Sequence, residues 1–328
     1  MAQLVAAFGS SHSIMLAATA EDWTRGFRES DQRMPLFDRD GTARDYDELL
    51  AAAPPNAESL IAPERLVAAY DRTFAGIAEL KRQIDATPLD ALIVAGDDQH
   101  ELFQDSMMPP LAIYYGETIR NAARHEVAKG DWYGRAQMER LEPERDAHYP
   151  VHGGLALHLI EGLTQAEFDV SAVRELAPDQ YEGHAFSYIH RTYLMGRELP
   201  IVPIMLNTYY APNQPTPKRC VALGRQLRTL IASYPGALRV GILASGGLSH
   251  FVVDEELDRG VIDAMRNKDL DYLAGLDPKR LQAGSSEIRS WIVTAAAAND
   301  LDLNWVEYIP AYRTPALTGT GLGFARWS

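Results

Sequence analysis

Short runs of apolar residues alternate along this chain with longer segments in which apolar positions recur every three or four residues. The short runs are typical of buried strands: Leu4–Phe8, Leu89–Ala95, Leu111–Tyr115, Pro200–Leu206 and Leu238–Ala244. The periodic segments predict helices: Glu64–Ala86, Gly154–Leu163, Pro217–Tyr234, Glu255–Asn267 and Glu287–Asn299. Strands that alternate with helices indicate an α/β fold, with three αβα layers built around a mainly parallel central sheet.

The chain shows no internal repeat, no low-complexity tract and no linker at which it could be divided. A length of 328 residues is compatible with one large α/β domain. We therefore expect a single domain over residues 1–328, with the polar segment Glu21–Pro55 as a surface excursion.

Composition and charge narrow the classes of partner. Hydrophobic residues make up 46% of the chain and charged residues 23%, which is typical of a soluble globular protein. The formal net charge of −14 argues against nucleic acid and against anionic membranes as partners. It also offers no long-range attraction to an anionic substrate, so a bound carboxylate would need a local arginine or lysine.

The single cysteine, Cys220, lies on the apolar face of a predicted helix, and we expect a buried, inert thiol. One cysteine cannot form an intramolecular disulfide, which fits a reducing compartment. The N-terminal residues lack the pattern of a signal peptide, and no window approaches the length of a membrane span. We therefore expect a cytoplasmic protein.

Three of the nine histidines directly follow predicted strands: His12, His100 and His250. The carboxyl ends of parallel strands converge on one crevice, where α/β proteins bind their ligands. His250 also follows a Gly-Gly pair, which allows a tight turn or a close backbone approach to a ligand. Four other histidines lie in helical or irregular stretches and are interpreted as structural or surface residues: His125, His158, His184 and His190.

Two histidines and one carboxylate form the facial triad that non-haem Fe(II) oxygenases use, and this triad leaves coordination positions open. Glu287 is the carboxylate candidate, in the first turn of a helix that Ser285 or Ser286 could cap. A glutamate at that position is also favoured by the helix dipole alone. From the spacing, a ligand role and a purely structural role for Glu287 both remain open.

Five motifs occur in an order that resembles one family: "SSHS", "MMPPL", "VHGG", "SGGLSH" and "SEIRSWI". The resemblance is to the class III extradiol ring-cleavage dioxygenases, the superfamily of the protocatechuate 4,5-dioxygenase β subunit, and it spans Ser11 to Trp327. It implies an Fe(II) ion bound by His12, His100 and Glu287.

The resemblance also assigns His250 as the acid–base histidine, and it assigns His152 as a second histidine of the active site. Relatives often carry Asp-His at the second ligand and Asp-His-Gly at the second histidine. This chain has Gln99 before His100 and Val151 before His152, and His148 is the alternative for the second role.

The implied activity is insertion of both atoms of O2 into a catechol- or gallate-type aromatic acid, with ring opening beside the vicinal hydroxyls. Gallate, 3-O-methylgallate and protocatechuate are the expected substrates. In the resemblance the C-terminal segment closes over the substrate, so that Arg313, Tyr308 and Tyr312 could hold its carboxylate. A solvated loop role for Arg313 is the alternative.

Two other functions remain open. The chain could be a non-catalytic interaction protein of the Memo type, which shares the fold. It could also be a hydrolase that holds zinc at the same triad, because two histidines and a glutamate with an open position suit Zn²⁺ as well. We expect a homodimer in each case.

Overall fold

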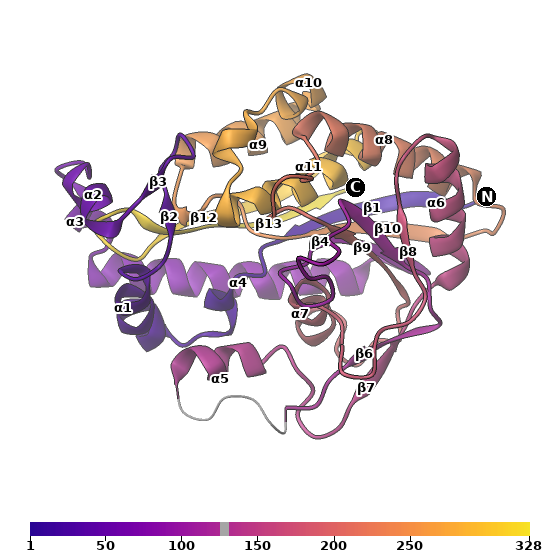
Figure 1. Cartoon of the computed structure of the whole chain (residues 1–328), viewed down its shortest axis with the longest axis horizontal. Coiled ribbons are helices and arrows are strands. Elements are labelled where there is room, and N and C mark those ends of the chain that lie inside the picture. The colour runs from indigo at the N-terminus through magenta and orange to yellow at the C-terminus, as the bar shows by residue number, and fades with distance from the viewer. Residues whose placement is uncertain (125–130) are drawn as a thin grey trace.

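The computed structural model describes residues 1–124 and 131–328, and a nine-stranded sheet runs through its middle (Figure 1). Its central strands are adjacent and parallel, in the order β1, β10, β4, β9. Their bounds are Gln3–Ser10 for β1, Arg239–Ser245 for β10, Ala91–Asp97 for β4 and Ile201–Leu206 for β9. The predicted α/β fold with a mainly parallel central sheet is confirmed.

Antiparallel strands extend the sheet at both sides. On one side, β5 (Leu111–Tyr114) pairs antiparallel with β9 and parallel with β8 (Ser171–Val173). On the other side, β13 (Thr318–Trp327) pairs antiparallel with β1, and also with β11 (His250–Val252) and β12 (Leu303–Tyr312). The C-terminal segment, which we expected to close over the substrate, is therefore built into the sheet.

Helices cover both faces of the sheet because successive strand residues point to opposite sides. In β4, Ile93 packs into one apolar core and the neighbouring Val94 into the other. One face carries α6 (Gly153–Gln165), α8 (Pro217–Ser233), α9 (Glu255–Asn267), α10 (Leu270–Ala274) and α11 (Ile288–Ala297). The other carries α4 (Pro63–Ala86), α5 (Trp132–Met138) and α7 (His184–Thr192).

Local signals explain where these helices begin. The side chain of Thr216 accepts a hydrogen bond from the backbone N–H of Arg219, and Pro217 occupies the first turn of α8. Cys220 then lies fully buried on this helix, and burial raises the pKa of its thiol to about 12. This burial agrees with the prediction of an inert thiol at Cys220.

The segment predicted as a surface excursion contains short elements, and its own residues Trp23, Phe27 and Leu36 are buried. Its elements are η2 (Asp22–Gly26), α1 (Phe27–Asp31), β2 (Leu36–Phe37), β3 (Ala43–Arg44) and α2 (Tyr46–Ala51). The other short elements are η1 (Ile14–Ala17), α3 (Ala57–Leu60), β6 (Thr118–Asn121), β7 (Ala147–Pro150), η3 (Pro278–Arg280) and η4 (Ala283–Glu287).

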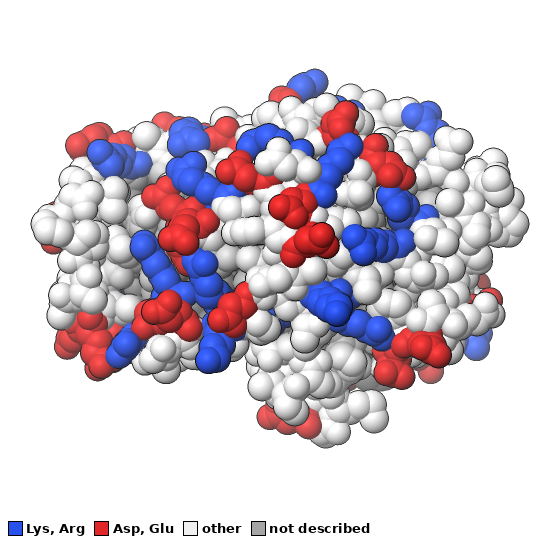
Figure 2. Space-filling view, turned by 90° about the horizontal axis from the view of Figure 1, so that it is seen from above, with Lys and Arg blue, Asp and Glu red and all other residues white. Residues whose placement is uncertain are grey.

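Acidic and basic side chains are interspersed on the face that carries α9 and α10 (Figure 2). They do not gather there into a patch of one sign, which is the usual footprint of a nucleic-acid-binding surface. None of the helices within the described ranges is long and apolar enough to span a lipid bilayer.

Candidate metal centre

The carboxyl ends of three adjacent strands bring polar side chains to one edge of the sheet. Asp97 is the last residue of β4, Ser245 is the last residue of β10, and His12 lies two residues beyond β1. A cavity of about 350 Å³ opens at this edge, within the usual range for a small-molecule site. His12, His184, His250 and Glu287 are among the residues that line it.

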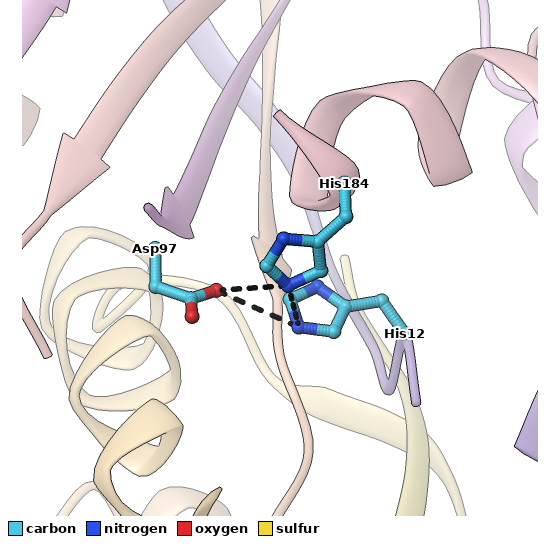
Figure 3. Close-up of side chains that lie close together, drawn as sticks. All are labelled: His12, Asp97 and His184. Carbon is cyan, nitrogen blue, oxygen red and sulfur yellow. Dashed lines mark hydrogen bonds and ion pairs between the residues drawn. The ribbon is translucent and has the colours of Figure 1, made fainter. Parts of the chain in front are cut away.

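Two imidazoles and a carboxylate face one another at this edge of the sheet: those of His12, His184 and Asp97 (Figure 3). The Nε2 atoms of His12 and His184 are 3.2 Å apart. Asp97 Oδ1 lies 3.5 Å from His12 Nε2 and 3.8 Å from His184 Nε2. Glu287 adds a second carboxylate, with Oε2 at 3.2 Å from His12 Nε2. Three potential metal-binding atoms therefore converge on one site, and Glu287 lies beside one of them.

Hydrogen bonds behind the imidazoles fix which nitrogen of each ring is free. The hydroxyl of Ser245 donates to the Ala185 carbonyl (2.7 Å), so its oxygen accepts from Nδ1–H of His12 (3.0 Å). Nδ1–H of His184 donates to Glu101 Oε2 at 2.7 Å. In both rings Nε2 is then the nitrogen that faces the cluster, the arrangement typical of metal-binding histidines.

Glu101 also fixes the start of α7. Its carboxylate accepts hydrogen bonds from the backbone N–H of His184, at 2.9 and 3.0 Å. A carboxylate at a helix N-terminus is stabilised by the unpaired N–H groups of the first turn. Burial disfavours the charge of Glu101, but His184 outweighs it and holds the pKa of Glu101 below its usual range.

The two carboxylates of the cluster have different environments. Burial and the nearby charge of Glu287 raise the pKa of Asp97. Burial disfavours the charged form of Glu287 as well, but His12 and His250 outweigh it and hold its pKa well below the usual range. The amide of Gln99 joins the pair, donating to Asp97 Oδ2 (2.9 Å) and to Glu287 Oε1 (3.3 Å).

These residues fit a divalent cation. Asp97 Oδ1 is buried and has no hydrogen-bond partner among the described residues, although it faces two imidazole nitrogens. A buried carboxylate oxygen without a donor is costly unless a cation completes its environment. Mixed imidazole and carboxylate donors suit iron, zinc and similar transition metals.

His250 lies on the other side of Glu287 from His12. Its Nδ1–H donates to the Leu248 carbonyl (2.9 Å), and its Nε2 lies 3.3 Å from Glu287 Oε1. Burial opposes protonation of His250, but Glu287 outweighs it and raises its pKa. The glycines around it make room for the ring, since a Cβ at Gly247 would lie 2.7 Å from His250 Cε1 and one at Gly284 only 1.8 Å from His250 Cδ2.

The structure does not bring His100 to the cluster. Its ring stacks on Tyr210 with centroids 3.7 Å apart, and its Nε2 lies 3.1 Å from Asp105 Oδ1. The histidine that stands beside His12 is His184, which the sequence reasoning had treated as structural. The structure thus places His184, and not His100, beside His12, because α7 packs against β4 and β10.

His152 and its alternative also lie elsewhere. His152 Nδ1 accepts a hydrogen bond from the backbone N–H of Leu155 (3.1 Å), so this ring caps the start of α6. His148 is exposed on β7. Neither lines the cavity as far as the described residues define it.

The three residues expected to hold a substrate carboxylate are engaged in other contacts. Arg313 forms two hydrogen bonds with Asp31, at 2.9 and 3.0 Å, and both side chains are buried. Tyr308 donates to Asp258 (2.7 Å) and Tyr312 to Glu255 (2.8 Å). Within the described ranges none of the three lines the cavity, because β12 and β13 carry this segment into the sheet.

Glu287 ends the 3₁₀ helix η4, directly before α11, and no side chain caps α11. The expected caps Ser285 and Ser286 lie within η4 instead. Other histidines have partners of their own, since His190 pairs with Glu182 and His158 with the Leu230 carbonyl. His125 lies outside the described residues.

Sequence reasoning missed two residues of the cluster, His184 and Asp97. Asp97 could have been found, because it directly ends a buried strand at the ligand-binding edge. His184 gives a weaker signal, as the first residue of a helix after Gly183.

Two comparisons with known proteins bear on the function of the chain. A profile of the family described as "Catalytic LigB subunit of aromatic ring-opening dioxygenase" matches residues 60–323. The chain is also 30% identical over 190 residues to the gallate dioxygenase of Pseudomonas putida, covering 51% of this chain and 51% of that protein. The aligned part thus spans about half the length of this curated relative.

Proposed function

Because the chain belongs to the family of catalytic LigB subunits of aromatic ring-opening dioxygenases, we propose that it is an Fe(II)-dependent extradiol dioxygenase. Its substrate is a catechol- or gallate-type aromatic acid, and the ring opens beside the vicinal hydroxyls. The observation that carries the proposal is the buried cluster of His12, His184, Asp97 and Glu287 at the carboxyl edge of the sheet.

In this proposal, His12 and His184 hold the metal through Nε2, and Asp97 and Glu287 supply carboxylate oxygens. When bound, ferrous iron would acidify the substrate hydroxyls and make dioxygen reactive toward the ring. The chain's own residues do the rest. Ser245 and Glu101 hold the two imidazoles in the metal-binding tautomer.

His250 is the group placed to move a proton. Its Nδ1–H is occupied by the Leu248 carbonyl, so Nε2 is the nitrogen that can accept a proton from a substrate hydroxyl and return it later. The ring points into the same cavity as the metal cluster. Glu287, which touches both His12 and His250, connects the proton-transfer side of the cavity with the metal side.

The test begins with protein purified without oxygen and analysed for bound metals. Oxygen uptake is then measured with gallate, 3-O-methylgallate and protocatechuate, and the product formed under ¹⁸O₂ is weighed by mass spectrometry. We expect iron, oxygen uptake and a product that contains both labelled atoms. Protein that binds zinc and consumes no oxygen with any of the three acids would refute the proposal and favour a hydrolase.

His12→Ala is the negative control, because it removes one metal-binding imidazole of the cluster. The cytoplasmic location and the homodimer stay predictions. Size-exclusion chromatography with light scattering tests the latter.

A further inference from the structure

Arg140 brings a permanent positive charge to the wall of the cavity. It lies two residues beyond α5, and its Nη2 donates to the carbonyl oxygen of His12 at 2.6 Å. Among the described residues that line the cavity, it is the one arginine or lysine. The guanidinium group is therefore held beside the metal cluster by the backbone of a metal-binding residue.

This guanidinium is short of partners. Its Nε is buried and has no hydrogen-bond partner in residues 1–124 and 131–328, and it forms no ion pair with a carboxylate of those residues. The nearest acidic neighbours are engaged, since Glu101 binds His184 and Glu287 binds His12 and His250. Arg140 is half-buried, and a partly desolvated cation with a buried N–H that lacks an acceptor is stabilised by an anion that supplies one.

The space next to Arg140 extends beyond the metal cluster. A second hollow of about 110 Å³ shares Arg140, Gln137 and Tyr181 with the main cavity, together with Glu101 and His184, which bind each other. The side-chain amide of Gln137 and the hydroxyl of Tyr181 are hydrogen-bonding groups. A planar carboxylate matches the fork of a guanidinium group and would fit this polar end of the cavity.

We propose that Arg140 binds the carboxylate of the substrate and thereby selects ring-hydroxylated benzoates over neutral catechols. The inference rests on the proposed function, and it gives to Arg140 the role first expected of Arg313. His12 links the two parts of the cavity, because its Nε2 faces the metal cluster and its carbonyl oxygen accepts the hydrogen bond from Arg140.

The experiment compares 3,4-dihydroxybenzoate with its neutral isostere 3,4-dihydroxybenzamide. Binding of each to Fe(II)-loaded protein is measured by calorimetry without oxygen, so the result does not depend on turnover. The wild type should bind the acid more tightly than the amide. Arg140→Met should weaken binding of the acid by about one to two orders of magnitude, the effect of losing a charge-assisted hydrogen bond, and barely change binding of the amide.

Two further variants serve as controls. Arg140→Lys keeps the charge and loses the fork, so it should retain part of the preference for the acid. Arg225→Met removes an exposed arginine of α8 and should leave both affinities unchanged. If Arg140→Met does not fold, Arg140→Lys and the wild-type comparison of acid with amide carry the test.

The possible outcomes distinguish a failure of the role proposed for Arg140 from a failure of the ring-cleavage proposal. Equal losses for acid and amide in Arg140→Met, or a wild type that binds the amide as tightly as the acid, would overturn the role of Arg140 and leave the ring-cleavage proposal standing. A wild type that binds neither compound would overturn both.

Discussion

Replacing His184 with alanine separates the ligand set seen in the structure from the one expected from sequence. His184 Nε2 lies 3.2 Å from His12 Nε2 and is held there by Glu101, whereas His100 stacks on Tyr210 and faces Asp105. His184→Ala should therefore cost the protein much of its metal affinity, and His100→Ala should not.

The magnitude follows from the number of ligands. Protein sites with four zinc ligands bind their metal with about 10–16 kcal/mol, so that one ligand contributes roughly 3 kcal/mol. Losing it should weaken metal binding by about 100-fold or more. Glu101→Gln leaves His184 in place but removes the charge behind its Nδ1–H, and we expect a loss of about 10- to 100-fold.

The assay is competition between the protein and a chelator of known affinity for Fe(II), carried out without oxygen, with circular dichroism as the control for folding. The expected order of metal affinity places wild type and His100→Ala together, Glu101→Gln below them, and His184→Ala lowest. If His100→Ala lost metal while His184→Ala kept it, the ligand set argued from the structure would be refuted and the one expected from sequence restored.

Three other variants test separate parts of the structure. His250→Phe should keep metal affinity and lower turnover by about 10²- to 10⁴-fold, because it removes a proton-transfer group; loss of iron would contradict that role. Arg313→Met should lower the free energy of unfolding by about 3–5 kcal/mol in urea titrations, because it leaves Asp31 buried without its partner. A selective loss of carboxylate binding in that variant would instead support the role first expected of Arg313. Burial raises the pKa of Asp258 from 3.8 to about 6, so the folded state binds this proton more tightly than the unfolded chain, and about 3 kcal/mol of stability is lost as pH rises from about 4 to above 6. Asp258→Asn should flatten that part of the stability profile, and an unchanged slope between pH 4 and pH 7 would contradict the assignment.

The sequence alone determined the central parallel strands, several long helices and the edge of the sheet where the site lies. The apolar run Leu89–Ala95 predicted β4, and the periodic segment Glu64–Ala86 predicted α4, because burial on one or both faces imposes a local pattern that needs no knowledge of the rest of the chain. His12 and His250 were found for the same reason, since each follows a strand at its carboxyl end.

Only the tertiary structure decided which side chains meet there. His184 reaches His12 because a helix distant in sequence packs against β4 and β10, and no local pattern encodes that approach. Arg313 and Arg140 are both arginines near predicted elements, and the chain alone does not distinguish them. Arg313 is neutralised by Asp31, which lies 282 residues away in the sequence. Arg140 lies beside the cavity and has no anionic partner among the described residues. Periodicity is a property of neighbouring residues, whereas pairing of charges depends on contacts that exist only once the sheet has formed.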